Sequence, residues 1–373
     1  MTTHGPPPLA GYTVAVTAAR RADELGALLE RRGARVVHAA AIRLVPLEDD
    51  SELQVATKAC LDRPPDVTIA TTGIGFRGWL EAADGWGLGD DLRKRLGDSR
   101  LLARGPKARG AIRAEGLTEE WSPASESMSE VLDHLLAQNH LERMRIAVQL
   151  HGEPLPDFVD ALRAAGADVV TVPVYRWERP AESTATDRLL EQIDAGGVDA
   201  ITFTSAPAVV SLLQHAQERG AEPALLAALG RSVLPVCVGP VTAAPLERRG
   251  VAAVQPDRPR LGNLARAVVE HVPARCGRQL RVRGHELDIR GHAVVVDGGL
   301  LALPPALMAV FGALAAQPGR VISRPELLAS LPGSGTDEHA VEMAVTRLRA
   351  ALGDAGIIQT IVKRGYRLAY DPV

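Results

Sequence analysis

An internal repeat with a period near 133 residues constrains this chain more than any other feature of its sequence. Three pairs of segments match in order: VTIATTGIGFRGWL (67–80) with AITFTSAPAVVSLL (200–213), LLARGPKARGAIRAEGL (101–117) with PVCVGPVTAAPLERRGV (235–251), and residues 13–37 with residues 145–170. Each matched unit has a short apolar strand, a turn rich in Gly, Ser, Thr or Pro, and an amphipathic helix. Because alternating strands and helices form parallel sheets covered by helices, the repeat predicts an α/β body with two similar lobes.

The turns of this repeat carry the candidate ligand-binding groups. In parallel α/β sheets, ligands bind outside the carboxyl ends of the strands, and the turns at 71–75, 104–107, 204–207 and 238–242 collect there. Their hydroxyls and glycine amides lie beside helix N-termini and favour carboxylates or phosphates, although Ser and Thr also cap helices without binding any ligand. Between the copies, 40–47 and 171–180 are extended and bounded by proline, which predicts a two-stranded connection.

Chain length, charge distribution and the lack of long apolar runs indicate what kind of protein this is. The 373 residues suffice for two or three domains. Residues 275–373 hold 12 Lys and Arg against 9 Asp and Glu, whereas the rest of the chain holds 30 against 36, so the tail is the part suited to a polyanion. No apolar run approaches the ~20 residues that span a bilayer, and the first residues lack an apolar signal segment. We therefore expect a cytoplasmic protein with no membrane partner.

The common motifs of metal, nucleotide and nucleophile sites are missing or incomplete. The 3 cysteines form no C-x-x-C pair and the 10 histidines have no metal-binding spacing, so we expect no metal site. The spacing G-x-G-x-x-G occurs at Gly73, Gly75 and Gly78, but no acidic residue clearly ends a strand about 20 residues further on. There is no Walker loop and no G-x-S-x-G elbow. The sequence predicts no cofactor.

Over residues 11–272 the body resembles uroporphyrinogen-III synthase. The segments that carry the resemblance are ITFTSAPAVVSLL (201–213), VCVGPVTAAPLERRGV (236–251) and VPVYR (172–176). The resemblance implies a bilobed fold, with lobe one at about 11–40 plus 180–272 and lobe two at about 46–172. It also implies a cofactor-free reaction that closes linear hydroxymethylbilane with inversion of its last pyrrole ring.

The resemblance also assigns candidate site residues. Tyr175 would be the acid that protonates or orients the leaving hydroxyl, unless it is an ordinary interlobe residue. The candidate substrate-binding residues are Thr17, Thr71, Thr72, Thr204, Ser205, Gly239 and Thr242. Three segments depart from the family pattern: Thr17-Ala18-Ala19-Arg20 replaces T-R-P, Thr71-Thr72-Gly73-Ile74 replaces T-S-x-N, and Gln149-Leu150-His151-Gly152 stands where an Arg often follows the strand. The body is thus a sensor, a dimerisation or contact domain, or a working synthase.

A different pattern begins after a predicted linker at 273–280, whereas residues 1–10 are expected to be disordered. LDIRGHAVVVDGGLLALPP (287–305) predicts short strands with a turn at Asp297-Gly298. Ser323-Arg324-Pro325-Glu326 predicts a capping box. A helix from about Asp337 to Leu352 carries one apolar stripe: Val341, Ala344, Val345, Leu348 and Leu352. A final strand, turn and strand place Lys363 and Arg364 at the tip of a hairpin.

Residues 281–371 resemble the winged helix-turn-helix domain of OmpR/PhoB-type response regulators. PGRVISRPELL, AVTRLRAAL and TIVKRGYRL match its signatures in order. The resemblance implies binding to promoter DNA, with Thr346, Arg347 and Arg349 facing bases and phosphates, and Lys363 and Arg364 as wing contacts. An ion pair inside the domain is the alternative role for one of the two arginines of R-L-R.

Together the two resemblances imply a transcriptional regulator of an actinobacterial type, with a link to nitrate and nitrite assimilation or tetrapyrrole supply. Its candidate partners are promoter DNA, a tetrapyrrole or other anionic ligand, a second transcription factor and a second copy of the chain. An active synthase with a DNA-binding tail is the alternative.

Overall fold

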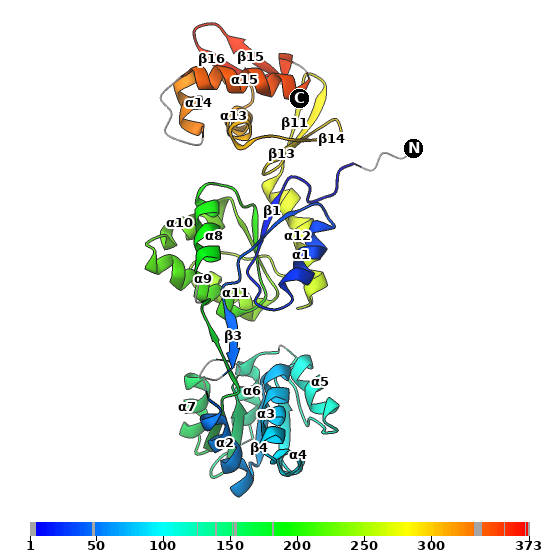
Figure 1. The fold of residues 1–373 in the computed structure, drawn as a ribbon, viewed down its shortest axis with the longest axis vertical. Helices are drawn as coiled ribbons and strands as arrows, with labels where there is room; N and C mark the ends of the chain where they lie inside the picture. The colour runs from blue at the N-terminus through cyan, green and yellow to red at the C-terminus, as the bar shows by residue number, and fades with distance from the viewer. Residues whose placement is uncertain are drawn as a thin grey trace. The chain divides into compact units, whose positions relative to one another are not determined.

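The structure is a computed structural model of the 373-residue chain, and its description covers residues 5–46, 49–124, 126–138, 140–150, 152, 155–180, 183–331, 338–353, 355–369 and 371. The chain divides into two compact units. Unit 1 comprises Met1–Ile42 and Pro180–Val373, and unit 2 is Arg43–Arg179. Unit 1 contains lobe one and the C-terminal domain, whereas unit 2 contains lobe two (Figure 1).

Lobe one is a parallel four-stranded sheet in the order β10-β9-β1-β2 with helices packed against it. Its strands are β1 (Thr13–Val16), β2 (Arg35–His38), β9 (Ala200–Phe203) and β10 (Leu234–Cys237). Its helices are α1 (Ala22–Glu30), α8 (Thr184–Asp194), α9 (Ala206–Glu218), α10 (Glu222–Arg231), α11 (Pro240–Glu247) and α12 (Leu261–Cys276). The central strands β1 and β9 are buried along their whole length, as expected for short apolar strands covered on both faces.

Lobe two repeats this plan with the order β5-β4-β6-β7. Its strands are β4 (Val67–Ala70), β5 (Arg100–Ala103), β6 (Arg145–Gln149) and β7 (Asp168–Val172). Its helices are α2 (Ser51–Asp62), α3 (Gly73–Gly85), α4 (Gly89–Asp98), α5 (Pro106–Ala114), α6 (Met128–Leu136) and α7 (Pro156–Ala164). Strand by strand, β5, β4, β6 and β7 correspond to β10, β9, β1 and β2 at the repeat spacing, which confirms the predicted two-lobe α/β body.

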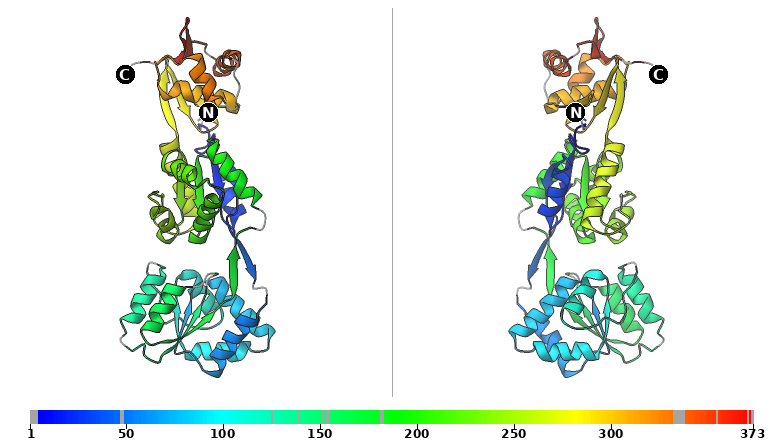
Figure 2. Two further views of the ribbon diagram at one scale, coloured as in Figure 1. Left: turned by 90° about the vertical axis from the view of Figure 1, so that its left-hand side faces the viewer. Right: turned by 90° about the vertical axis from the view of Figure 1, so that its right-hand side faces the viewer.

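The predicted two-stranded connection is also present. Strands β3 (Arg43–Pro46) and β8 (Tyr175–Glu178) pair antiparallel, with Arg43 opposite Glu178 and Pro46 opposite Tyr175. Figure 2 shows the two strands side by side. The arrangement brings Tyr175 into unit 2, where its neighbours come from lobe two.

The C-terminal domain begins with an antiparallel sheet of β11 (Arg278–Val282), β12 (His285–Ile289), β13 (Ala293–Val296) and β14 (Gly299–Ala302). It continues with α13 (Pro305–Ala316), α14 (Arg324–Ser330), α15 (His339–Leu352), the 3-10 turn η1 (Ala355–Ile357), and a hairpin of β15 (Ile358–Ile361) and β16 (Gly365–Leu368). Three helices followed by a hairpin make a winged helix-turn-helix, as predicted. The apolar stripe of α15 is buried in this domain's core, and Asp337 lies outside the described residues.

Local signals in this domain are confirmed at two places. Ser323 Oγ accepts a hydrogen bond from Glu326 N at 3.3 Å, and the Glu326 carboxylate accepts one from Ser323 N at 2.8 Å, which completes the capping box. Asp297 and Gly298 have φ angles of 49° and 83°. Two left-handed residues in succession are what a tight two-residue hairpin requires, so β13 and β14 join without an added loop.

Two segments differ from the sequence-based expectation. The predicted linker at 273–280 holds the last turn of α12 and the start of β11, with only Gly277 between the two elements. Residues 7–10, expected to be disordered, are ordered: Leu9 is fully buried, and its amide donates to Arg32 O at 2.8 Å. The proline-rich composition of the N-terminus suggested disorder, but burial of Leu9 offsets the cost of ordering these residues.

Asp199, the residue before β9, gives a first prediction. Its carboxylate accepts a hydrogen bond from Thr13 N at 2.7 Å, yet burial raises the pKa of Asp199 from 3.8 to about 6. The folded state therefore binds the proton more tightly than the unfolded state. Stability from the protonated group is fully present below pH 4 and is lost as the pH rises from about 4 to 6.

The Asp199→Asn variant removes the buried charge and keeps an acceptor for Thr13 N. At pH 7.5 we expect its free energy of unfolding to exceed that of the wild type by about 1–3 kcal/mol, because a shift of about two pKa units corresponds to about 3 kcal/mol. At pH 4 the gain is expected to vanish. Urea unfolding followed by circular dichroism at both pH values measures the difference in free energy of unfolding. A variant less stable than the wild type at pH 7.5 would contradict a raised pKa of Asp199.

Candidate functional site

The carboxyl edge of the sheet in lobe one presents hydrogen-bond donors that are not used by the protein. Ser205 precedes α9 in extended conformation and makes no side-chain capping bond, and Gly239 precedes α11 in the same manner. Thr242 lies in the first turn of α11 and is 5% exposed. Within the described part of the chain, the hydroxyls of Thr204, Ser205 and Thr242 and the amide of Gly239 show no hydrogen bond to protein. This edge is suited to an anionic ligand.

Thr17, the remaining candidate in lobe one, forms hydrogen bonds within the sheet and offers no free hydroxyl proton to a ligand. It is fully buried at the end of β1, and its hydroxyl donates to Thr202 O at 2.8 Å. Its amide donates to the same carbonyl at 3.3 Å. Thr17 thus holds the ends of β1 and β9 together beneath the edge that carries Ser205.

The equivalent edge of lobe two is occupied by the side chain of Gln149, which is fully buried at the end of β6. Its Oε1 accepts hydrogen bonds from the amides of Thr71 and Thr72, each at 3.1 Å. The Thr71 hydroxyl donates to Gln149 O at 2.7 Å, and the Thr72 hydroxyl accepts from Gly75 N at 3.1 Å as the N-cap of α3. The Thr71-Thr72 turn of lobe two is therefore satisfied internally, whereas the hydroxyls of the corresponding Thr204-Ser205 turn of lobe one are open.

The repeat identifies the cause of this difference between the lobes. Thr17 of lobe one corresponds to Gln149 of lobe two, one residue after β1 and at the end of β6. The longer carboxamide reaches the turn at Thr71 and Thr72, whereas the short Thr17 side chain stops at the neighbouring carbonyl. No room remains for another group, because even a Cβ on Gly75 would overlap the Gln149 amide nitrogen.

A second prediction concerns Gln149. The Gln149→Ala variant leaves the amides of Thr71 and Thr72 buried without an acceptor, so we expect the free energy of unfolding of lobe two to fall by about 2–4 kcal/mol. All four tryptophans of the chain, Trp79, Trp86, Trp121 and Trp177, lie in unit 2, and their fluorescence during urea unfolding reports on lobe two alone. The control is Gln54→Ala on α2, whose side chain forms no hydrogen bond in the described part of the chain, and this change should cost less than about 1 kcal/mol. Equal midpoints for the two variants would contradict the role of Gln149.

Tyr175 lies on β8 beside the first turn of lobe two. Its hydroxyl is 3.2 Å from the Thr72 hydroxyl, and its ring lies near Gly152 together with that of Trp177. The Trp177 Nε1 is buried and has no hydrogen-bond partner in the described part of the chain. The structure thus brings the predicted site residues Tyr175 and Thr72 into direct contact, although they are 103 positions apart in the sequence.

Arg104 is a candidate site residue that the sequence reading missed. It follows β5, and burial lowers the pKa of its guanidinium, while Tyr175 and Glu126 act in the opposite direction. Among the described residues its guanidinium forms no hydrogen bond or ion pair. An arginine remains cationic in proteins, so Arg104 supplies a mostly buried positive charge near the Tyr175 phenol and the Glu126 carboxylate. The repeat alignment carried the signal, since Val238 occupies the corresponding position in lobe one.

The DNA-binding candidates lie on the exposed face of α15 and at the tip of the β15–β16 hairpin. Thr346 and Arg347 are exposed on α15, and Met343 beside them is 49% exposed. Lys363 and Arg364 are exposed at the hairpin tip, where Lys363 has a φ of 62°. In the described part of the chain the Arg347 guanidinium forms no hydrogen bond, ion pair or ring contact.

Arg349 has a different environment from Arg347. Its Nε and Nη2 donate to Ile358 O at 2.9 and 2.6 Å, and Nη2 also donates to Thr360 Oγ1 at 2.9 Å. Its guanidinium lies 5.8 Å from the centre of the Tyr366 ring. These contacts attach α15 to the first strand of the wing, so Arg349 positions the wing rather than offering a free donor to a base.

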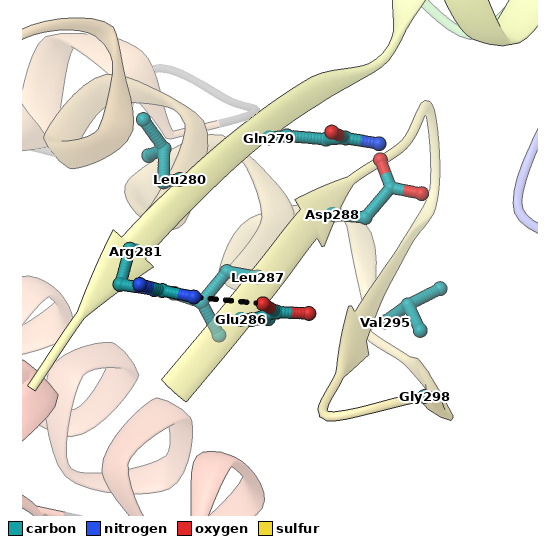
Figure 3. A pocket seen from close by; sticks show the side chains of 8 residues that line it. All are labelled: Gln279, Leu280, Arg281, Glu286, Leu287, Asp288, Val295 and Gly298. Carbon is teal, nitrogen blue, oxygen red and sulfur yellow. Dashed lines mark hydrogen bonds and ion pairs between the residues drawn. The ribbon is translucent and has the colours of Figure 1, made fainter. Parts of the chain in front are cut away.

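A hollow of about 360 Å³ lies on the first sheet of this domain, and its lining side chains are drawn in Figure 3. It is lined by Gln279, Leu280, Arg281, Glu286, Leu287, Asp288, Val295 and Gly298. Arg281 and Glu286 point toward each other across neighbouring strands and pair at 3.0 Å. None of the predicted site residues lines this hollow, so the candidate sites remain the lobe edges and α15.

Comparison with known proteins identifies both parts of the chain. A family model described as uroporphyrinogen-III synthase HemD matches residues 23–266, and one described as transcriptional regulatory protein, C terminal, matches residues 298–368. The chain is 28% identical over 260 residues to the uncharacterized protein YjjA of Bacillus subtilis (strain 168), a match that covers 68% of this chain and 93% of that protein. It is 26% identical over 238 residues to a putative uroporphyrinogen-III synthase of Methanothermobacter thermautotrophicus, covering 64% and 89%.

A solved structure agrees with these matches. The crystal structure of a mutant uroporphyrinogen III synthase from the extremely thermophilic bacterium Thermus thermophilus aligns with a TM-score of 0.60 and 30% identity, covering 70% of this chain and 98% of that one. Among the described residues, no helix is long and apolar enough to span a membrane, and no three His, Cys, Asp or Glu side chains are grouped to hold a metal ion.

Proposed function

Since the chain belongs to the uroporphyrinogen-III synthase family and carries the C-terminal domain of transcriptional regulatory proteins, we propose that its body is the sensor of a DNA-binding regulator. The ligand is a tetrapyrrole or a related polycarboxylate, and the carboxyl edge of each sheet offers a binding surface for its carboxylates. Occupation of these edges changes the affinity of the winged helix for promoter DNA.

The observation that carries this proposal is the contrast between the two lobe edges. Lobe one offers the hydroxyls of Ser205 and Thr242 and the Gly239 amide, which favour carboxylate groups. In lobe two, Gln149 takes the place of a ligand at the amides of Thr71 and Thr72, so anion binding there depends on Arg104. Anion-binding groups are thus retained, while part of the donor set that would surround a reacting substrate is already satisfied.

An active synthase is the second candidate, and it is favoured by one contact. Tyr175 lies 3.2 Å from Thr72, in a position where a phenol can protonate or orient a leaving hydroxyl. The test is to incubate freshly generated hydroxymethylbilane with the full chain and with Tyr175→Phe, and to separate the type III ring from the type I ring that forms spontaneously. The sensor proposal predicts type I only for both proteins, whereas type III from the wild type alone would make the body an enzyme.

The other partners remain predictions. A second transcription factor and a second copy of the chain are compatible with a regulator, and a link to nitrate and nitrite assimilation comes from the resemblance of the whole fusion to actinobacterial regulators. Genome-wide mapping of the DNA bound by the protein tests the regulated genes directly.

A further inference from the structure

The N-terminal segment of lobe one is bonded to the C-terminal domain through Arg290, which follows β12. Its Nη1 donates to Ala10 O at 2.7 Å and to Pro7 O at 3.2 Å. Its guanidinium lies 5.7 Å from the centre of the Tyr12 ring, and its Nε donates to the Asp288 carboxylate at 2.9 Å. One arginine thus joins two carbonyls and an aromatic ring of lobe one to a carboxylate of the DNA-binding domain.

The backbone of the same turn approaches lobe one closely. His292 N donates to Gly11 O at 2.8 Å, and His292 Nδ1 lies 3.4 Å from the Thr13 hydroxyl. Gly291 faces Asp199 so closely that a Cβ would overlap its carboxylate. Gly11 has a φ of 90°, and a Cβ there would lie 2.9 Å from that of Ala293. Lobe one and the DNA-binding domain therefore pack closely at Gly11 and Gly291, where a larger side chain would overlap the opposite surface.

The strands of lobe one that meet this turn also reach the candidate ligand edge. Thr13 begins β1 and Thr17 directly follows it, while Asp199 precedes β9 and Ser205 lies just beyond its end. Four residues of strand separate the two edges, a length of about 13 Å. Strands β1 and β9 are hydrogen-bonded neighbours at the centre of the sheet. We therefore expect a displacement of β1 or β9 at the ligand edge to be transmitted to the end of the strand that meets the turn.

We propose that the turn Arg290–His292 is an intramolecular docking element that makes lobe one and the DNA-binding domain a single cooperative unit. The docking itself does not depend on what the body binds. Its regulatory use, in which the ligand edge of lobe one acts on the DNA-binding domain through β1 and β9, rests on the proposed function.

The test compares urea unfolding of the full chain, followed peptide by peptide with hydrogen exchange, among matched variants. Gly291→Ala removes the close fit to Asp199, and Arg290→Ala removes the bonds to Pro7 and Ala10. The control is Arg281→Ala, which lies on the same sheet, pairs only with Glu286 among the described residues, and is exposed. Two disrupting variants are used because either substitution alone can also disturb the fold of the sheet.

In the wild type and in Arg281→Ala, peptides of lobe one and of the DNA-binding domain are expected to lose protection at one urea midpoint. In Gly291→Ala and Arg290→Ala the two midpoints are expected to separate, and peptides covering residues 9–13 and 290–293 to exchange faster without urea. Separate midpoints in the wild type, or a common midpoint in both disrupting variants, would overturn the proposal.

Adding duplex DNA tests the coupling without any ligand of the body. DNA that binds the native C-terminal domain raises the urea midpoint of that domain by mass action. If the two domains unfold cooperatively, the urea midpoint of lobe one rises as well. We expect DNA to raise both midpoints in the wild type and only that of the DNA-binding domain in the disrupting variants. A rise confined to the DNA-binding domain in the wild type would overturn the coupling. Absence of any rise would instead refute DNA binding, and the midpoints without DNA would still decide the docking.

Discussion

Replacing Arg347 with alanine is expected to weaken binding to operator DNA about tenfold or more, with no loss of stability. Arg347 is exposed on α15 and its guanidinium has no partner in the described part of the chain, so it is available to a guanine or a phosphate. A bidentate contact from arginine to a base contributes about 1–3 kcal/mol of discrimination. Fluorescence anisotropy with a duplex selected by the protein itself, measured at several salt concentrations, gives both the affinity and its salt dependence.

The Arg349→Ala variant is the informative comparison, because it changes the same residue type two positions away. Arg349 is bonded to Ile358 O and Thr360, so its loss should lower the stability of the DNA-binding domain and weaken DNA binding through the displaced wing. Arg347→Ala should leave the unfolding midpoint within experimental error. If the Arg347 variant bound DNA with wild-type affinity and salt dependence, the exposed face of α15 would not be the recognition surface.

The second large effect is expected at Arg104, where the Arg104→Val variant should lose ligand affinity and gain stability. Valine is the residue that the repeat places at the corresponding position 238. Removal of this mostly buried cation is expected to raise the free energy of unfolding of lobe two by about 1 kcal/mol or more, because the desolvation of the guanidinium outweighs its attraction to Tyr175 and Glu126. The same change should weaken binding of a polycarboxylate about tenfold or more, because a charge-assisted contact of about 1.5–3 kcal/mol is lost.

A gain in stability together with a loss of ligand affinity would distinguish a binding role of Arg104 from a structural role. Tryptophan fluorescence during urea unfolding measures the stability of lobe two, and calorimetric titration with uroporphyrinogen III measures the affinity. The control is Arg109→Ala on α5, whose exposed guanidinium lies 3.8 Å from Glu119. This variant should leave both the stability of lobe two and the affinity for uroporphyrinogen III close to those of the wild type. A less stable Arg104→Val variant would show that Arg104 is a structural residue.

The architecture could be predicted from the sequence because its signals are local or periodic. The 133-residue repeat predicted two similar α/β lobes with parallel sheets, and adjacent residues predicted the capping box at Ser323 and the turn at Asp297. The outward and buried faces of α15 followed from helical spacing, and the core positions Val345 and Leu348 are as expected.

The site was harder to predict because its contacts join residues that are distant in sequence. Gln149 and Thr71 are 78 positions apart, and no spacing rule indicates that the carboxamide of one occupies the turn of the other. Arg290 and Ala10 are 280 positions apart, so the N-terminal segment was interpreted from its composition alone. The role of Arg349 depends on the carbonyl of Ile358, which only the folded hairpin brings within reach.

The most direct test of the regulator proposal is the affinity of the full chain for its selected duplex, measured with and without uroporphyrinogen III. The proposal predicts a change in DNA affinity of about fivefold or more, the usual size of coupling between two sites. The change should disappear in a variant that combines Ser205→Ala with Thr242→Val, while the affinity without ligand stays the same. A DNA affinity that is identical at every concentration of the tetrapyrrole would contradict the proposal.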